Sequence, residues 1–72
     1  MINDPIKGEI WINYLQEQFL ILEIALNTEF SDYWVVYKNL DTEQVLVTDL
    51  DVWHSDKFLN GEEVKRFRKK YL

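Results

Sequence analysis

The clearest hydrophobic pattern lies between positions 33 and 40, in the run YWVVYKNL, where six of the eight residues are apolar. Aromatic and β-branched residues dominate this run, which favours a β-strand. Both of its faces are apolar, with Tyr33, Val35 and Tyr37 on one side and Trp34, Val36 and Leu40 on the other. Because a strand washed by water carries polar residues on its outer face, we expect a central strand that is covered on both sides.

A second strand is predicted over residues 43–50, EQVLVTDL. Its two faces are Val45 with Val47, and Leu46 with Thr48. The segment 39–44, NLDTEQ, is typical of the turn that joins it to the preceding strand. The segment 27–32, NTEFSD, has the same turn character.

The segment 9–29 fits two templates. At helical period, one face is Ile12, Leu15, Phe19, Leu22 and Leu26. At a period of two, one face is Leu20, Leu22, Ile24 and Leu26, and the other is Phe19, Ile21 and Ala25. Periodicity alone therefore leaves one helix and two strands equally open.

The C-terminal third begins with a short helical turn, expected near residues 50–56, in which Val52, Trp53 and Phe58 plug one end of a barrel. Asn60-Gly61 is a strong hairpin signal, because both residues tolerate positive φ. The same Asn60 fits a helix N-cap with Glu63 at the third position. We favour a hairpin over 57–67, and the tail stays open between a strand and a short helix.

Composition limits the class of protein. The 72 residues predict one domain, 1–72, and a hydrophobic content of 47% with two Gly and one Pro excludes disordered chains. The absence of Cys excludes disulfides and thiolate metal sites and favours a reducing compartment. The N-terminus lacks a signal-peptide pattern, and the apolar run FLILEIAL, broken by Glu23, is too short to span a bilayer. We therefore expect a cytoplasmic protein without membrane contact.

Charge is divided unequally along the chain. Residues 1–64 hold three basic and thirteen acidic residues, a formal charge of -10, whereas the segment 65–72 carries five basic residues. Such a body disfavours direct nucleic-acid binding, because it repels phosphates. The acidic body keeps a hydrophobic protein soluble while the tail lies over it, or one pole contacts a partner.

The sequence offers little chemistry for catalysis. His54 is the only His, and its spacing from Asp51 and Asp56 matches no recognised metal or catalytic site. Gly8 and Gly61 stand alone, so no phosphate-binding loop is present. We therefore expect no enzyme activity, no catalytic residues, no metal and no cofactor.

The candidate binding residues are aromatics beyond the needs of a small core, together with arginines of the basic tail. They are Trp11, Tyr14, Trp53, Arg66 and Arg68. Interleaved aromatic and basic side chains are typical of contacts with phosphates or nucleotides. A pocket with Arg66 beside Trp11, Tyr14 or Trp53 would support a nucleotide-type ligand.

The order of these residues resembles a small bacterial and phage family called domain of unknown function 1653. The residues that carry the resemblance run in order from about 9 to 67: Trp11, Tyr14, Phe19, Ala25, Thr28-Glu29, Val35-Val36-Tyr37, Leu40, Trp53, Gly61, Val64 and Arg66-Phe67. The chain departs from the family pattern at Asn13 or Asn27, where the family tends to carry His, and at Thr48-Asp49, where it tends to carry Arg-Pro. The resemblance implies a small, mostly β domain, two strands in 9–29 with a turn around Gln16-Glu17, and no known activity.

These observations together predict a mainly β domain: a small, strongly bent antiparallel sheet or an SH3-like barrel with one helical turn. The expected function is that of a non-enzymatic adaptor of bacterial or phage origin that binds another protein, with a homodimer through an aromatic face as an accessory state. Two rival functions stay open. One is an acidic inhibitor that mimics nucleic acid, and the other is a nucleotide binder that uses the aromatics and the tail arginines.

Overall fold

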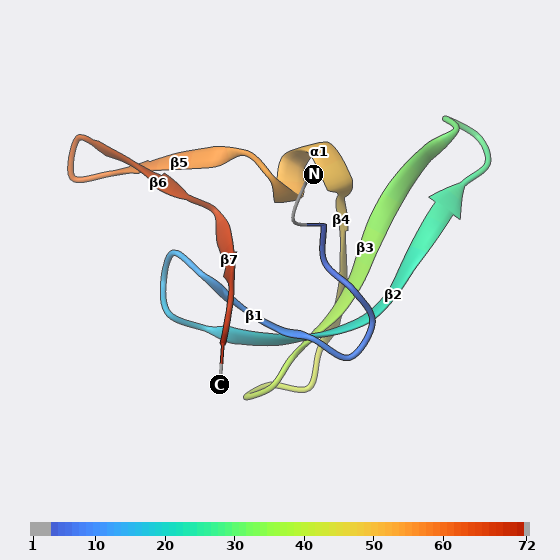
Figure 1. Cartoon of the computed structure of the whole chain (residues 1–72), viewed down its shortest axis with the longest axis horizontal. Helices are drawn as coiled ribbons and strands as arrows, with labels where there is room; N and C mark the ends of the chain where they lie inside the picture. The colour runs from blue at the N-terminus through green and yellow to red at the C-terminus, as the bar shows by residue number, and fades with distance from the viewer. Residues whose placement is uncertain (1–3, 72) are drawn as a thin grey trace.

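The computed structural model describes residues 4–71. Residues 1–3 and 72, which belong to the predicted domain, lie outside the described residues. The elements are β1 (Ile10–Asn13), β2 (Gln18–Asn27), β3 (Asp32–Asn39), β4 (Val45–Asp49), α1 (Leu50–Trp53), β5 (Asp56–Leu59), β6 (Glu62–Lys65) and β7 (Phe67–Lys69) (Figure 1). The prediction of a mainly β fold with one short helix is confirmed.

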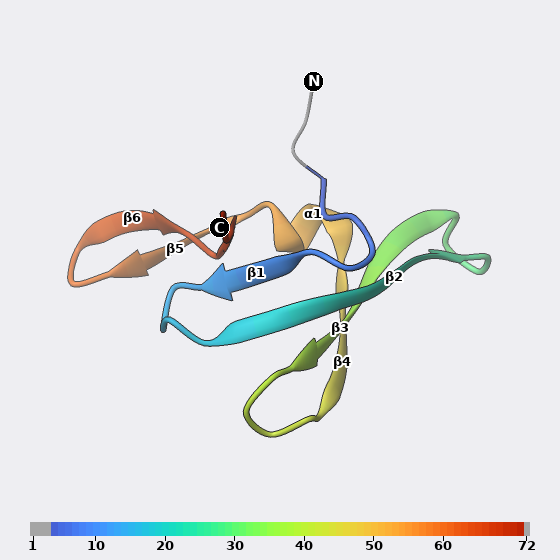
Figure 2. The same ribbon diagram turned by 60° about the horizontal axis from the view of Figure 1, so that its bottom comes forward.

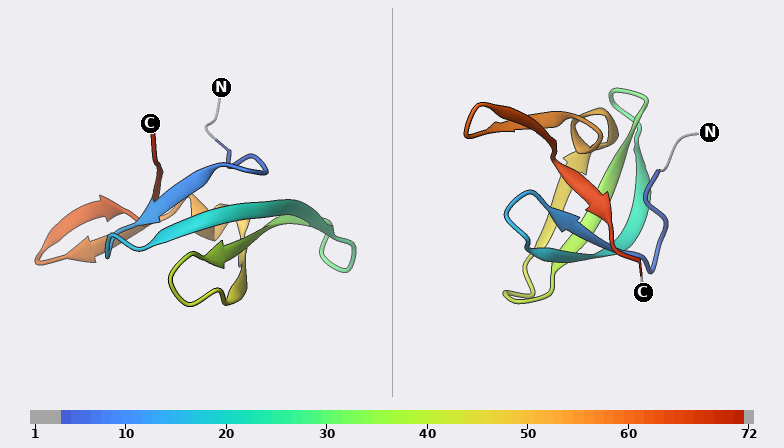
Figure 3. Two further views of the ribbon diagram at one scale, coloured as in Figure 1. Left: turned by 90° about the horizontal axis from the view of Figure 1, so that it is seen from below. Right: turned by 60° about the vertical axis from the view of Figure 1, so that its left-hand side comes forward.

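Five strands form one antiparallel sheet in the order β4-β3-β2-β1-β7, and β5 pairs only with β6 as a separate hairpin. The sheet curls strongly, and the β5–β6 hairpin projects away from it (Figures 2 and 3). Strands β4 and β7 are the two ends of the sheet. Of the two predicted forms, the structure is thus the bent antiparallel sheet, with no hydrogen-bonded pairing of β4 with β7 to close a barrel within residues 4–71.

The ambiguous segment 9–29 forms β1 and β2 rather than a helix. The side chain of Asn13 organises the turn between them, because its Oδ1 accepts hydrogen bonds from the backbone N–H groups of Leu15 and Glu17. Gln16 adopts φ 70°, a left-handed backbone conformation that is uncommon for residues other than glycine and is typical of tight turns. The turn predicted around Gln16-Glu17 is therefore confirmed.

A β-bulge at Leu22 divides β2 into two halves. Ile21 pairs with Tyr37 and Glu23 pairs with Val36, so Leu22 is the extra residue. One face of β2 consequently carries Phe19, Ile21, Ile24 and Leu26, and the other carries Leu20, Leu22 and Ala25. The predicted grouping of Leu20 and Leu22 with Ile24 and Leu26 is wrong, because an inserted residue shifts the alternation.

The prediction of a hairpin in the C-terminal third is confirmed. Asn60 and Gly61 have φ 53° and 80°, the two positive values of a type I′ turn between β5 and β6. The tail continues as strand β7, which pairs with β1. The expected grouping of Val52, Trp53 and Phe58 is wrong: only Trp53 is buried, whereas Phe58 lies on β5 with 77% of its surface exposed.

The core lies on one face of the sheet, here called the inner face. It contains Trp11, Phe19, Ile21, Val35, Tyr37 and Trp53. Trp53 is its centre, since its ring stacks on Phe67 at 3.7 Å and meets Tyr37 and Trp11 edge-on at 5.0 and 5.6 Å. Helix α1 is therefore fixed to the sheet by one indole ring.

Strand β3 is central, as predicted, but it is covered on one side only. Val35, Tyr37 and Asn39 are buried against the inner face. The opposite positions, Trp34, Val36 and Lys38, are only half-buried. The expected second cover is absent from this side of β3 within the described residues, and this side is here called the outer face of the sheet.

We predict that Trp53→Ala lowers the free energy of unfolding by about 3–5 kcal/mol, because it removes the buried ring that contacts Trp11, Tyr37 and Phe67. A chain of this length has a total stability of about 4–11 kcal/mol, so the variant should be largely or wholly unfolded at 37 °C. Phe58→Ala removes an exposed ring of β5 and should change stability by less than about 0.5 kcal/mol. Urea unfolding followed by circular dichroism measures both, and equal losses would contradict the central role of Trp53.

Candidate binding surfaces

The outer face of the sheet carries many apolar side chains, interspersed with the charged side chains of Glu23, Lys38, Asp49 and Arg68. Register and alternation place nine apolar side chains there, from four strands: Ile10, Ile12, Leu20, Leu22, Ala25, Trp34, Val36, Val45 and Val47. Val36 pairs directly with Val47, and Ile10 with Leu20. All nine are half-buried or exposed, and Val45 and Val47 keep 56% and 52% of their surface in contact with solvent.

Segments outside the sheet lie against the inner face rather than the outer one. Trp53 of α1 belongs to the core, and His54 after it binds Asp4 of the N-terminal segment, with 2.7 Å between Nε2 and Oδ1. Pro5 is buried. Within the described residues, the apolar side chains of the outer face thus lack the layer that covers the inner face.

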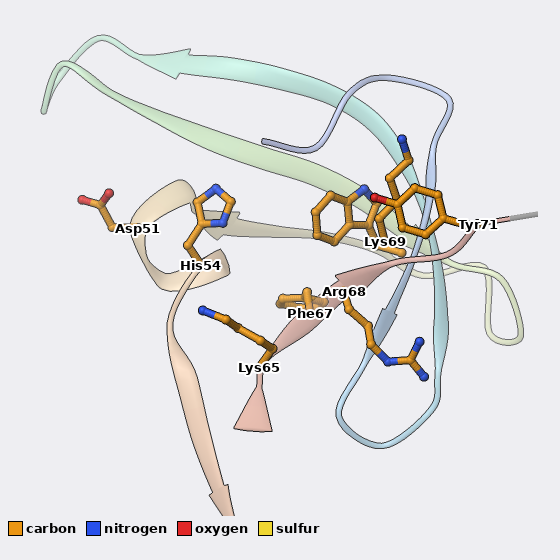
Figure 4. A pocket seen from close by; sticks show the side chains of 8 residues that line it. Asp51, His54, Lys65, Phe67, Arg68, Lys69 and Tyr71 are labelled. Carbon is orange, nitrogen blue, oxygen red and sulfur yellow. The ribbon is translucent and has the colours of Figure 1, made fainter. Parts of the chain in front are cut away.

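A cleft of about 810 Å³ forms the second surface, between α1 and the strand β7. Figure 4 shows Asp51 and His54 of the α1 side across from Phe67, with Lys65 below them and Lys69 and Tyr71 further along the chain. Trp11 also lines this cleft. Figure 4 shows the guanidinium group of Arg68 directed away from His54 and Asp51.

Most positive charges of this cleft already have carboxylate partners. Lys69 Nζ lies 2.8 Å from Glu9 Oε2, and Lys65 Nζ lies 3.3 Å from Asp56 Oδ1. Partial burial opposes ionisation of Glu9, but hydrogen bonds from Lys69 and from the Trp11 indole bring its pKa below the usual value. The hydrogen bond to Glu9 raises the pKa of Lys69. The pair Glu9–Lys69 is therefore an ion pair that ties the start of β1 to β7.

The structure brings some of the predicted site residues together, although not as one nucleotide site. Trp11 meets Trp53 in the core, Trp11 and Arg68 line the same cleft, and Tyr14 and Arg68 line a second, smaller one. Trp11 and Trp53 are core residues, with exposed fractions of 4% and 1%. The ring of Tyr14 lies under Lys57, with Nζ 5.6 Å from its centroid. Arg66 donates from Nε to Ser55 Oγ, and Arg68 donates from Nη2 to Gln16 Oε1. Arg66 therefore does not lie in the cleft beside Trp11, as a nucleotide site of the predicted kind requires.

None of the binding residues predicted from the sequence belongs to the outer face except Arg68, so the prediction missed this surface. Its signal is present in the sequence, because Trp34, Val36, Val45 and Val47 are apolar at positions that would be polar on a solvated face. The same apolar residues also fit a strand that its own chain buries on both faces. Only the register of β3 with β4 shows that these residues share one exposed surface.

Two carboxyl groups meet at the end of β3 and β4. A hydrogen bond with Asp49 raises the pKa of Asp32, and the same hydrogen bond lowers the pKa of Asp49. Asp49 Oδ1 also accepts a hydrogen bond from the backbone N–H of Asp51, at 2.8 Å, and so caps α1. The proximity of the two groups thus favours the protonated form of Asp32 and the ionised form of Asp49.

Residues 4–71 contain no group of three or more Asp, Glu or His side chains arranged to hold a metal ion. The single helix in this part of the chain is far too short to cross a membrane.

Comparison with known proteins identifies a family but no activity. The sequence profile of a family described as "Protein of unknown function (DUF1653)" matches residues 9–69, which is most of the chain. Searches of curated proteins and of solved structures find no match.

We predict that Asp32→Asn raises the melting temperature at pH 7, because its amide donates to Asp49 without needing a proton. Because the pKa of Asp32 is raised in the folded protein, its protonated side chain stabilises the fold. This stabilisation is complete below the unfolded pKa near 3.8 and is lost as the pH rises through the folded pKa. The lowered pKa of Asp49 acts in the opposite direction: its contribution is present above the unfolded value and is lost as the pH falls through the folded pKa. The gain from Asp32→Asn should therefore shrink as the pH falls from 7 toward 4.

Asp41→Asn is the matched control, since it removes one exposed carboxylate in the turn between β3 and β4. Thermal unfolding of both variants between pH 4 and 7 measures the effect. A gain for Asp32→Asn that is independent of pH, or equal for both variants, would show that the two carboxyl groups do not share a proton.

Proposed function

Because the chain belongs to the DUF1653 family, whose description assigns no activity, we propose its function from its geometry: it is a non-enzymatic module that binds another protein through the outer face of its sheet. The proposal thus assigns the expected adaptor role to one surface of the chain. That surface is built from β1, β2, β3 and β4.

The single observation that carries this proposal is the set of nine apolar side chains on the outer face. Contiguous apolar patches larger than a few hundred Å² are typical of interaction sites in soluble proteins. Val36 and Val47 lie opposite each other in the middle of the β3–β4 pair, and Trp34 is two residues from Val36. An aromatic ring beside β-branched residues is the composition of an interface core.

The total surface of the chain supports the same proposal. It amounts to 5332 Å², whereas a monomeric protein of this mass exposes roughly 4,800 Å². The projecting β5–β6 hairpin accounts for part of this difference. The difference is of the order of one partner's share of a standard interface, about 800 Å².

The two rival functions have less support. A nucleotide ligand needs free positive charge directed into the cleft, but Lys65 and Lys69 are paired with Asp56 and Glu9, and Arg68, which also lines the cleft, directs its guanidinium group away from His54 and Asp51. A mimic of nucleic acid needs regularly spaced carboxylates on one exposed face, whereas the strand positions of the outer face carry only Glu23, Asp32 and Asp49. Catalysis has no more support than these two functions. The ring of His54 is hydrogen-bonded to Asp4, and the Ser55 hydroxyl is hydrogen-bonded to the carbonyl of Val52 and to Arg66 Nε.

We predict that Val47→Lys abolishes partner binding without unfolding the protein, because it places a charge in the middle of an apolar surface that is exposed in the free chain. Leu15→Lys is the matched control: it changes an exposed aliphatic residue to lysine in the β1–β2 turn, away from the outer face. Light scattering at micromolar concentration, at low and high salt, shows first whether the partner is a second copy. In that case Val47→Lys should give a monomer, whereas Leu15→Lys should remain a salt-resistant dimer.

If the free chain is a monomer, a photoreactive residue replaces Val36 or Leu15, and the two proteins are irradiated in cells. Position 36 should trap one defined protein that position 15 does not. Equal capture at both positions, or no capture at position 36 by a monomeric chain, would contradict binding through the outer face.

A further inference from the structure

Strand β7 is an end strand of the sheet, and one of its edges has unpaired backbone groups. The N–H of Lys70 donates to the carbonyl of Ile10, and the carbonyl of Arg66 accepts from the N–H of Tyr14. In an antiparallel ladder, residues two apart direct their backbone groups to the same neighbour. The N–H and C=O groups of Phe67 and Lys69 therefore point away from β1, toward the side of the cleft.

The side chains of β7 divide between the two faces of the sheet. Phe67 and Lys69 lie on the inner face, where Lys69 is opposite Trp11 and both line the cleft. Arg68 and Lys70 alternate with them and lie on the outer face, about 7 Å apart along the strand. A strand added to the free edge would thus meet an aromatic cleft on one side and two positive charges on the other.

The two outer charges differ from those of the cleft, because they are held by neutral partners. Arg68 Nη2 lies 3.2 Å from Gln16 Oε1, and Lys70 Nζ lies 2.9 Å from Gln18 Oε1. Within residues 4–71, neither forms an ion pair with a carboxylate, although this part of the chain contains all thirteen acidic residues. Their charge is available to a partner.

We propose that β7 accepts an extended segment of a partner protein as an additional strand, and that this segment alternates acidic and apolar residues. Its backbone pairs with the free N–H and C=O groups of Phe67 and Lys69, as in other cases of strand addition. Its acidic residues lie opposite Arg68 and Lys70, at cross-strand distances of about 5 Å. The apolar residue between them lies opposite Lys69 on the side of the cleft, and the next apolar residue lies opposite Phe67.

The same charges argue against other occupants. Two copies of β7 would place Arg68 and Lys70 against like charges, and positive residues on edge strands are a known protection against such self-pairing. A nucleic-acid strand would find the same two cations, but it offers no backbone amides for Phe67 and Lys69, and it is repelled by the -10 charge of residues 1–64. An acidic extended peptide satisfies both the edge and the charges.

This inference goes beyond the proposed function, because it concerns a different surface and does not need Val36 or Val47. The probe is a synthetic seven-residue peptide that alternates Glu with apolar residues, Glu-Val-Glu-Phe-Glu-Val-Glu with blocked ends. The control peptide has the same composition with its four Glu in one block. Both are titrated into the full chain and followed by two-dimensional NMR.

We predict that the alternating peptide binds at least about tenfold more tightly than the block peptide. The backbone amide protons of Phe67 and Lys69 should become protected from solvent exchange on binding, because they acquire hydrogen-bond partners. Arg68→Glu should weaken binding by about tenfold, since an attractive cross-strand charge pair becomes repulsive. A peptide with Lys in place of the Glu residues should bind Arg68→Glu better than the original chain.

Lys38→Glu is the matched control variant, because it makes the same change of charge on the outer face of β3, away from β7. It should leave peptide binding unchanged. The proposal is overturned if neither peptide binds at millimolar concentration, if both bind equally, or if the amides of Phe67 and Lys69 stay unprotected. None of these outcomes alters the test of the outer face, which depends on position 47.

Discussion

The stacking of Trp53 on Phe67 is the contact on which the rest of the structure depends. The two rings lie 3.7 Å apart and almost parallel. They join α1 to β7, two elements that no strand pairing connects. Phe67 in turn contacts Phe19 and Tyr37 edge-on, so the same contact reaches β2 and β3. A sheet of five strands with free ends would not hold its curvature by hydrogen bonds alone. The indole ring fills the concave side of the sheet and fixes how far it bends, and the space left between α1 and β7 is the cleft.

The bulge at Leu22 has a second consequence for the binding surfaces. It turns Ile24 and Leu26 toward the core side and leaves Leu20, Leu22 and Ala25 on the outer face. A short chain then has more apolar side chains than one core can bury, because a single concave face accommodates only a few large rings. Part of the surplus lies on the outer face of the sheet, and part lies in turns, at residues such as Leu15 and Phe30. An apolar surface of this kind, on a chain with a net charge of -5, is better explained by a binding partner than by the needs of folding.

The separation of charge along the chain is partly neutralised in the fold. Lys65 of β6 reaches Asp56 across the hairpin, and Lys69 of β7 reaches Glu9 on the inner face, so both cations serve the structure. Arg68 and Lys70, on the opposite face of the same strand, meet only glutamine oxygens. One alternating strand thus divides its cations between stabilising the fold and remaining available at the edge of the sheet.

The sequence by itself determined the elements whose signals are local. The β-branched and aromatic run of β3, the Asn60-Gly61 turn and the turn around Gln16-Glu17 each depend on residues within a few positions of one another, and the ordered pattern from Trp11 to Phe67 identified the family. The tertiary structure alone decided the features that depend on register and on distant contacts. Alternation cannot reveal an inserted residue at Leu22, so the faces of β2 could not be assigned correctly. An apolar residue looks the same in a sequence whether its own chain buries it or leaves it exposed. The apolar residues Trp34 and Val36 therefore predict a strand that is covered on both sides. Trp11 meets Trp53 in the core, whereas Arg66 binds Ser55. The positions of α1 and β7 come from side-chain packing across more than forty residues, which no local pattern encodes.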